Sequence, residues 1–431
     1  MKTFLFMPES AYGPTNNCIG TGNLLRQRGH RVVFAAESSW AGRLEPLGFV
    51  EDLVDLAPSP DQNDGDADAG QFWTDFIRET APEFRKPTIE QLESFVRPTW
   101  QALIDGARYS HDQLTEIISR NRPDVIVEDN VNCFPALLTA GVPFVRVMSC
   151  NPLEVRGPDV PPVFSGYPSN DRSGWDEFRS EYARTHRDLW MGYDEWVRSV
   201  GAPPLPDLDF IHVSEHLNLY LYPTELDYTS RRPLGAAWQR LDSSVRTTDA
   251  EFELPERLRS PGFDAAPDSA LVYLSLGSLG SADIDLMRRL VDLLGSSRHR
   301  FVVSKGPLAD EYELPSNMCG AAQVPQTSVL PQVDLVITHG GNNTTTESVH
   351  FGKPMIVLPL FWDQYDNAQR VDELGIGKRL PTYAFEDHEL FDAVDGLLAD
   401  VDLRRRVADI GAAVRARDGI ALAADRLEQV V

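Results

Sequence analysis

A short run of residues in the last quarter of the chain carries side-chain types that bind anions. The run, residues 338–347, reads Thr-His-Gly-Gly-Asn-Asn-Thr-Thr-Thr-Glu and follows Leu335–Ile337, an apolar, β-branched segment that is typical of a strand. Glycines let a backbone approach an anion closely. Asn343 and Thr344 are residue types that begin helices, and the first amide groups of a helix point at a bound anion. The pattern predicts a cradle for a diphosphate.

Other side chains around this cradle suit other chemical groups. His339, at the expected carboxyl end of the strand, can donate a hydrogen bond to a phosphate oxygen, an interaction worth about 1.5–3 kcal/mol when one partner is charged. Glu347 lies one turn into the helix, where it can accept two ribose hydroxyls or simply interact with the helix dipole. Asp363 and Gln364 follow the next expected strand, and an acid beside an amide suits sugar hydroxyls.

The elements that must position these side chains recur in two series. Short apolar runs alternate with helical segments such as Ile19–Arg28 and Ile284–Leu294, as in a doubly wound parallel sheet. We therefore predict an α/β fold of two doubly wound, Rossmann-like domains that face a cleft. The predicted strands are Thr3–Met7, Arg31–Ala36, Asp124–Val127 and Phe144–Met148 in the first series, and Leu271–Leu276, Phe301–Ser304, Leu335–Thr338 and Met355–Leu358 in the second.

A stretch with prolines, charges and little periodicity, from about Arg231 to Asp268, separates the two series. We assign residues 1–240 to a first domain, 241–268 to a linker and 269–431 to a second domain that ends in helices. Residues 61–68 are rich in Asp, Gly and Ala and predict an exposed loop. Its acids lack the closing Glu of an EF-hand, so calcium binding is not expected.

Composition excludes several classes of protein. A chain of 431 residues with 42% hydrophobic content can form two cores. No window approaches the roughly 20 uninterrupted apolar residues of a membrane span, so we expect a cytoplasmic protein. The formal net charge of −25 disfavours a nucleic-acid partner. The four cysteines lie far apart, so we expect reduced thiols and no metal site.

At these residues the chain resembles the family 1 glycosyltransferases, which have the two-domain GT-B fold. Their signature has a His, a Gly two residues on, an Asn four on, a Ser or Thr next, a Glu eight on, and later an Asp-Gln pair. The matching positions here are His339, Gly341, Asn343, Thr344, Glu347, Asp363 and Gln364. The resemblance covers nearly the whole chain. It implies that the His, Asn and Thr hold the diphosphate, the Glu holds the ribose and the Asp-Gln pair holds the transferred sugar.

Two further pieces concern the donor nucleotide. Gly277 and Ser278 match a Gly-Ser turn that lies near the phosphates in the family, although Gly-Ser is also an ordinary turn. The family usually has Trp-x-Pro-Gln where the Trp stacks on uracil, whereas this chain has Gln323, Val324, Pro325 and Gln326. Glu347 favours a ribose with both hydroxyls and hence a uridine donor, whereas Gln323 leaves a thymidine donor open.

The chain also departs from the family at the catalytic base. The family has a His in Gly-His-x-x-Pro, or an Asp in some antibiotic enzymes, where this chain has Pro14, which cannot accept a proton. The family's supporting Asp corresponds to Asp129, the candidate base here; Glu128, Glu9, or an acceptor that is acidic or an amine, are alternatives. Asp129 is equally suited to capping the next turn. A positioned base contributes roughly 10²–10⁴-fold, whereas holding donor and acceptor in line supplies about 7–11 kcal/mol without it.

The acceptor in this family binds to the first domain. Residues 161–167 and a helical stretch with Trp175, Phe178, Trp190, Tyr193 and Trp196 lie in that region. Aromatic walls suit flat, hydrophobic acceptors, although aromatic residues at helical spacing more often pack in a core. The sequence identifies neither the acceptor nor the oligomeric state.

The resemblance implies an inverting, metal-independent hexosyltransferase of secondary metabolism. It would move a sugar, expected to be glucose, from a UDP-sugar to a small hydrophobic acceptor, with no cofactor besides this co-substrate. The missing base motivates one alternative, a catalytically silent GT-B partner that binds a nucleotide sugar or activates another transferase. An epimerase or phosphorylase with the same architecture is disfavoured by the His-to-Glu spacing and the trailing Asp-Gln pair.

Overall fold

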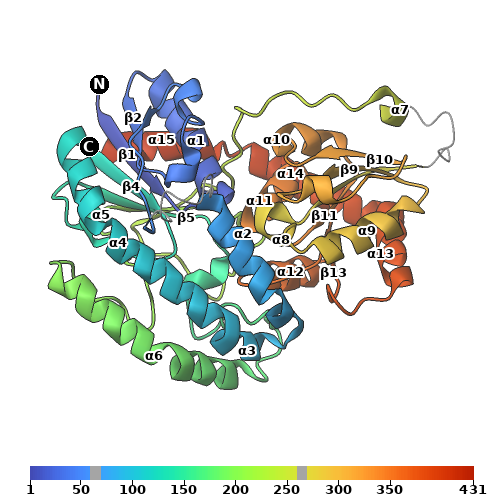
Figure 1. The fold of residues 1–431 in the computed structure, drawn as a ribbon, viewed down its shortest axis with the longest axis horizontal. Helices are drawn as coiled ribbons and strands as arrows, with labels where there is room; N and C mark the ends of the chain where they lie inside the picture. Colours follow the sequence, from blue (N-terminus) through green and yellow to red (C-terminus); the bar gives the residue numbers. More distant parts are fainter. Residues whose placement is uncertain (59–68, 260–268) are drawn as a thin grey trace.

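The computed structural model describes residues 1–58, 69–259 and 269–431, and it contains two α/β domains that lie beside each other (Figure 1). Within the described residues, the first domain has a seven-stranded sheet with the order β3-β2-β1-β4-β5-β6-β7, and the second has a six-stranded sheet with the order β10-β9-β8-β11-β12-β13. Neighbouring strands pair in parallel in both sheets. The predicted fold class is confirmed.

Every strand predicted from the sequence is present, with ends at most two residues from those predicted. The first sheet contains β1 (Thr3–Pro8), β2 (Arg31–Phe34), β3 (Val50–Glu51), β4 (Val125–Asp129), β5 (Phe144–Met148), β6 (Leu217–Tyr220) and β7 (Trp238–Arg240). The second contains β8 (Leu271–Ser275), β9 (Arg300–Ser304), β10 (Met318–Ala321), β11 (Leu335–Thr338), β12 (Met355–Val357) and β13 (Gly377–Arg379). Strands β3, β6, β7, β10 and β13 were not predicted.

Helices cover the faces of both sheets (Figure 1). In the first domain they are α1 (Tyr12–Gln27), α2 (Ala69–Thr80), α3 (Thr88–Gln91), α4 (Arg97–Asn121), α5 (Pro135–Leu138) and α6 (Trp175–Ser199). The linker contains α7 (Glu256–Arg259). The remaining helices are α8 (Gly277–Gly280), α9 (Ile284–Gly295), α10 (Gln326–Val329), α11 (Asn342–His350), α12 (Gln364–Glu373), α13 (Asp387–Ala399), α14 (Val401–Arg415) and α15 (Gly419–Val430).

Helix α1 begins earlier than the sequence predicted. It starts at Tyr12 rather than near Ile19, so Pro14 lies in its first turn. A proline is tolerated there because the first amide groups of a helix have no partner within the helix. The segment that aligns with the family's catalytic loop is therefore the amino-terminal turn of a helix.

The two faces of the first sheet are buried against different helices. Along β1, Leu5 and Met7 belong to the core that also contains residues of α4, whereas Phe4 and Phe6 belong to the core that contains residues of α1. This division follows from the alternation of side chains along a strand. Burial on both faces is typical of a parallel sheet.

The last helix does not pack with the domain to which the sequence assigned it. Ala423, Ala424 and Leu427 of α15 lie in the core beneath α1, beside Phe4 and Phe6 of β1. Figure 1 accordingly shows both ends of the chain in the first domain. Residues 269–431, predicted as the second domain, thus end in a helix that covers the first. An apolar helix face does not specify by itself which sheet it covers.

Two further observations bear on the predictions. In the described parts of the chain, no helix is both long enough and apolar enough to cross a membrane. The loop predicted at 61–68 falls outside the described residues.

Candidate active site

The predicted diphosphate cradle lies where β11 meets α11. The backbone turns through His339, Gly340 and Gly341, and Gly340 has a φ of +89°, which favours glycine. The imidazole of His339 lies between two glycines. A Cβ atom added to Gly341 would lie 2.6 Å from its Nε2 atom, and one added to Gly277 would lie 2.7 Å from its Cε1 atom. The predicted residues Gly277 and Gly341 therefore make room for this ring.

Burial lowers the pKa of His339 to about 4. At neutral pH the ring is therefore uncharged and carries one N–H group. A neutral imidazole still donates one hydrogen bond, which is what the predicted contact with a phosphate oxygen requires. The amide groups at the start of α11 would supply further donors.

Glu347 lies deeper, one turn into α11, with only 2% of the residue exposed. Its Oε2 atom accepts a hydrogen bond from Nε2 of Gln326 at 2.6 Å, and its Oε1 atom accepts one from Nη1 of Arg246 at 3.0 Å. Gln326 in turn accepts hydrogen bonds from Thr344 at 3.3 Å and from the hydroxyl of Tyr273 at 3.2 Å. Three predicted donor-site residues, Gln326, Thr344 and Glu347, are thus joined in one network.

Sequence reasoning missed Arg246 and Tyr273. Arg246 lies in the predicted linker, and Tyr273 lies within a buried strand. Neither position carries a motif, and their contacts with the site join residues more than fifty positions apart.

Asp363 and Gln364 lie at the start of α12. The Oε1 atom of Gln364 accepts hydrogen bonds from the amides of Leu360 and Phe361 at 3.0 and 3.2 Å, so this side chain holds the turn after β12. The Oδ2 atom of Asp363 accepts hydrogen bonds from Nδ2 of Asn342 at 2.6 Å and from the amide of Asn151 at 3.1 Å. The carboxylate of Asp363 therefore lies where the cradle meets the first domain.

The preceding residue, Trp362, has a left-handed backbone with a φ of +57°. This conformation is unfavourable for a side chain of its size. Its ring packs against Trp100, with ring centroids 5.1 Å apart, and against Phe164, at 4.5 Å. Aromatic residues of the first domain therefore hold the turn that presents Asp363.

Asn343 also connects the two domains. Its Nδ2 atom donates a hydrogen bond to the carbonyl of Gly13 at 3.0 Å, and its Oδ1 atom accepts one from Asn17 at 3.1 Å. The first turn of α1, where the family carries its base, thus contacts the cradle directly. Whether Asn343 also binds phosphate stays a prediction.

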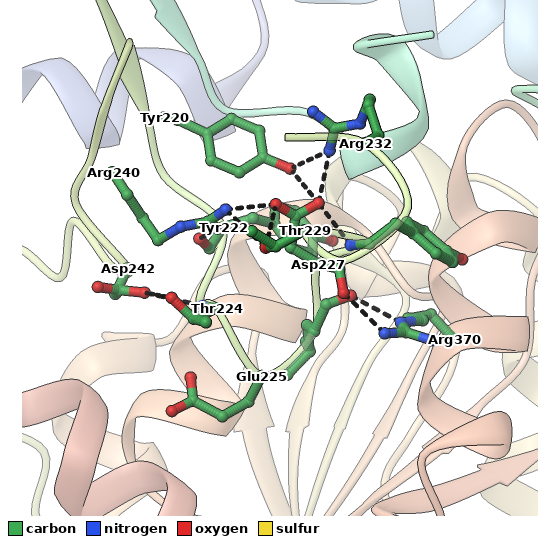
Figure 2. A network of polar contacts seen from close by, with 12 residues as sticks. Tyr220, Tyr222, Thr224, Glu225, Asp227, Thr229, Arg232, Arg240, Asp242 and Arg370 are labelled. Atoms are coloured by element: carbon green, nitrogen blue, oxygen red, sulfur yellow. Dashed lines mark hydrogen bonds and ion pairs between the residues drawn. The ribbon is translucent and has the colours of Figure 1, made fainter. Parts of the chain in front are cut away.

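A loop after β6 reaches the same place from the first domain. The hydroxyl of Tyr222 donates a hydrogen bond to Oδ1 of Asn342 at 3.0 Å. Figure 2 shows that Asp227 organises this loop, because its buried carboxylate contacts both Arg232 and Arg240. Arg370 of α12 donates hydrogen bonds to the carbonyls of Leu226 and Asp227 at 2.7 and 2.8 Å, which ties the loop to the second domain.

The candidate base Asp129 lies at the end of β4 and is 2% exposed. Its Oδ1 atom accepts a hydrogen bond from Ser149 at 2.8 Å, whereas its Oδ2 atom has no hydrogen-bond partner among the described residues. Burial raises its pKa well above the usual range, and the nearby Glu9 and Glu154 raise it further. A carboxylate with a raised pKa is a stronger base than an ordinary aspartate.

The alternation of side chains along β4 separates the two acidic candidates on this strand. Val125 and Val127 belong to the core on the α1 side of the sheet, whereas Ile126 belongs to the core on the α4 side. Asp129 therefore lies on the α1 side and Glu128 on the other. Glu9, the third candidate, accepts hydrogen bonds from Ser10 at 2.9 Å and from the amide of Ala11 at 3.0 Å, which stabilise the turn before α1.

The other predicted residues differ in their burial. Ser278 is half-buried in the short helix α8, Val324 packs against the core of its domain, and Gln323 lies at the surface.

Of the predicted acceptor-side aromatics, Trp175, Phe178 and Tyr193 are core residues, whereas Trp190 and Trp196 are half-buried. Among the residues that the structure describes, no group of three or more His, Cys, Asp or Glu side chains could hold a metal ion.

Comparison with known proteins bears directly on the family and the fold of this chain. Residues 288–428 match the family described as Erythromycin biosynthesis protein CIII-like, C-terminal domain. The NDP-glycosyltransferase YjiC of Bacillus subtilis (strain 168) is 33% identical over 430 residues, which cover 97% of this chain and 94% of that protein. The oleandomycin glycosyltransferase of Streptomyces antibioticus is 26% identical over 430 residues, with coverage of 97% and 88%.

Solved structures share the fold over their whole length. The glycotransferase of kitacinnamycin matches with a TM-score of 0.70 at 21% identity, covering 100% of this chain and 99% of that chain. The spinosyn rhamnosyltransferase SpnG matches with a TM-score of 0.63 at 20% identity, covering 99% and 100%. Two doubly wound domains of this kind define the GT-B class. The chain belongs to the family 1 glycosyltransferases of that class, as the sequence predicted.

Proposed function

We propose that this glycosyltransferase moves a hexose, expected to be glucose, from a UDP-sugar to a small hydrophobic acceptor, with inversion at the anomeric carbon. The observation that carries the proposal is the arrangement at β11 and α11. An uncharged His339 lies between two glycines just before α11, and the buried carboxylate of Glu347 lies one turn into that helix. These groups suit a diphosphate and a ribose, respectively.

Each residue has a role in the proposed reaction. His339 and the amides at the start of α11 stabilise the negative charge that develops on the leaving diphosphate, so no metal is needed. Asp363 and Gln364 bind the sugar hydroxyls. A heteroatom of the acceptor attacks the anomeric carbon, the bond from that carbon to the diphosphate oxygen breaks, and Asp129 accepts the proton of the acceptor. We infer that the first domain, residues 1–240, holds the acceptor and that residues 269–431 hold the donor.

The names of relatives support a natural-product acceptor and leave the sugar open. Relatives include the vancomycin aglycone glucosyltransferase of Amycolatopsis orientalis and the zeaxanthin glucosyltransferase of Pantoea ananas. Structures with the same fold include a rhamnosyltransferase and a forosaminyltransferase, and one was solved with thymidine diphosphate. Glucose is favoured by the first group, and a thymidine donor remains the competing hypothesis.

The absence of a first-loop base supports a second candidate, a catalytically silent partner of another transferase. Pro14 occupies the position of the base, and the first turn of α1 contacts Asn343 instead. Against this candidate stands the donor site, because a protein that never holds a donor has no need for the joined Gln326, Thr344 and Glu347.

The decisive experiment is mass spectrometry of the products formed from UDP-glucose and a panel of phenols, macrolides, sterols and amines. We expect a mass increase of one hexose for at least one acceptor, and we expect Glu347→Gln and His339→Ala to lose it. The exposed His388 of α13 provides a matched control, since His388→Ala leaves the site untouched. Binding of UDP without product from any acceptor in the panel would favour the silent partner.

A further inference from the structure

The predicted linker contributes a side chain to the donor site. Arg246 is largely buried, with 10% of its side chain exposed, and its Nη1 atom lies 3.0 Å from Oε1 of Glu347. The same guanidinium binds Asp249 through two hydrogen bonds, from Nε at 2.7 Å and from Nη2 at 2.8 Å. Such a two-bond contact fixes the orientation of the guanidinium plane and thereby the direction of Nη1.

Arg246 and Asp249 complete a ring of contacts around the predicted nucleotide site. The Oδ2 atom of Asp249 accepts hydrogen bonds from the amide of Thr327 at 3.2 Å and from its hydroxyl at 2.9 Å. Thr327 follows Gln326, which returns to Glu347 through its 2.6 Å hydrogen bond. The ring joins the linker, α10 and α11. It therefore holds together residues 323–326, which are expected to face the nucleobase of the donor, and the Glu347 carboxylate, which is expected to face the ribose.

The ring leaves hydrogen-bonding capacity on Glu347. An ionised carboxylate has about four acceptor positions, two on each oxygen. Arg246 uses one position on Oε1, and Gln326 uses one on Oε2. Each oxygen can thus accept one further hydrogen bond, as two neighbouring ribose hydroxyls require. A protonated carboxyl group cannot accept both.

The charge on Arg246 is the largest of the interactions that oppose protonation of Glu347. Burial raises the pKa of Glu347, and the nearby Asp249 raises it further, whereas Arg246 and the hydrogen bond from Gln326 lower it. Tyr273 also faces this carboxylate, and burial raises its pKa to about 12, so it is neutral at physiological pH. Without Arg246, Glu347 would be a buried acid beside a second acid.

We propose that Arg246 is a positioning residue that holds the Glu347 carboxylate ready for both hydroxyls of the donor ribose, and that it thereby sets the preference for ribose over 2′-deoxyribose. This inference rests on the proposed function, because it requires the site to bind a nucleoside diphosphate. It assigns a role in donor selection to a residue of the linker.

The test compares binding of UDP and 2′-deoxy-UDP by calorimetry, since these two ligands differ only in the 2′-hydroxyl. We expect the wild type to bind UDP about tenfold or more tightly than 2′-deoxy-UDP, the ratio for one hydrogen bond to a charged group. We expect Arg246→Met to reduce this ratio toward one at neutral pH. In Arg246→Met the ratio should recover as the pH rises and Glu347 loses its proton, whereas in the wild type it should persist to lower pH.

Further variants separate this role from a structural one. Arg246→Lys keeps the charge but cannot bind Asp249 and Glu347 through a planar, forked guanidinium, so it should restore part of the affinity ratio of UDP to 2′-deoxy-UDP. If Arg246→Met does not fold, the comparison of Arg246→Lys with the wild type tests the inference. Arg246→Met should change nothing further in a Glu347→Gln background. The control is Arg259→Met, which removes an exposed linker arginine paired with Glu253 at 3.0 Å.

Two results would overturn the inference, and they are distinguishable. If Arg246→Met and Arg246→Lys both keep the wild-type ratio at every pH, Arg246 has no part in ribose selection while the proposed function stands. If the wild type binds neither UDP nor 2′-deoxy-UDP nor thymidine diphosphate, the proposed function fails and this inference fails with it.

Discussion

The position of the His339 imidazole depends on Gly277 and Gly341, the two glycines on either side of the ring, and this dependence can be tested at Gly341. Its backbone, with a φ of −59° and a ψ of 144°, is accessible to any residue, so an added methyl group acts only through the 2.6 Å contact with the imidazole. We expect Gly341→Ala to displace the ring and to weaken UDP binding about tenfold or more, the effect of one lost hydrogen bond to a charged group.

Calorimetry with UDP measures this effect. Gly192 in α6 is a suitable control, since a Cβ atom there would have no neighbour within 4 Å. If the mechanism is correct, Gly341→Ala adds nothing to the loss caused by His339→Ala, because both changes remove the same contact. Additive losses would mean that Gly341 acts independently of the imidazole.

Asp129 is the second residue whose environment makes a prediction. If it takes the proton of the acceptor, Asp129→Asn lowers kcat about 10²–10⁴-fold while UDP affinity is unchanged. Because burial raises the pKa of this carboxyl, the wild-type rate should fall as the pH drops below that raised value. Initial rates at saturating acceptor measure both effects. Glu128→Gln, on the opposite face of the sheet, should keep the rate, and an unchanged rate in Asp129→Asn would exclude Asp129 as the base.

At the scale of elements, the loop after β6 owes its shape to one buried carboxylate. Asp227 is fully buried, and its contacts with Arg232 and Arg240 lower its pKa against the effect of burial (Figure 2). Asp227→Asn leaves both guanidinium groups without their counter-charge. We expect a loss of about 3–5 kcal/mol in the free energy of unfolding, measured by chemical denaturation.

A matched exposed pair provides the control for this prediction. Asp207 pairs with Arg187 at the surface, where 70% of the Asp207 side chain is exposed. Its replacement by Asn should cost at most about 1 kcal/mol. Equal effects of the two substitutions would show that the loop does not depend on Asp227. Since the pKa of Asp227 is lowered in the folded chain, its contribution to stability should be complete above about pH 3.8 and should be lost as the pH falls from there through the lowered pKa.

Across the whole molecule, buried acids make stability depend on pH. Burial raises the pKa of Glu128 to about 8, of Asp366 to about 8 and of Glu154 to about 7. The folded chain therefore retains protons that the unfolded chain releases. Stability from these groups is complete below their ordinary pKa values and is lost as the pH rises toward 8. Three histidines, the buried His186 and the half-buried His339 and His350, have pKa values lowered to about 4 and act in the opposite direction, but only below about pH 6.5.

These signs predict that Tm falls between about pH 6.5 and pH 8, where only the acids titrate. Glu128→Gln mimics the protonated acid and should flatten this decline. The effect on the free energy of unfolding should be up to about 1.4 kcal/mol for each unit of pKa shift that the substitution removes. Thermal scans across this range provide the measurement. Glu311→Gln, at an exposed position, should leave the slope unchanged. A Tm that rises over this range would contradict the assignment of these protons.

Much of the architecture and of the donor site could be read from local patterns. The strand β11, the glycine turn and the helix α11 follow each other within sixteen residues, so His339 and Glu347 are placed by backbone geometry alone. Strands of five or six residues such as β1 and β5 were also correct, because their apolar runs are long enough to be distinctive. Helix α1 was placed too late, since the sequence predicted a helical segment only from Ile19 whereas the helix begins at Tyr12.

Only the tertiary structure decided what meets at the domain boundary. It placed α15 on the first sheet, brought Arg246 to Glu347 across 101 positions of the chain, and joined Asn343 to the first turn of α1. Sequence alone determined eight of the strands, the glycine turn after β11 and the chemistry within each segment, because these depend on residues a few positions apart. Contacts between distant segments depend on how every intervening element packs, and a local sequence pattern does not predict this packing.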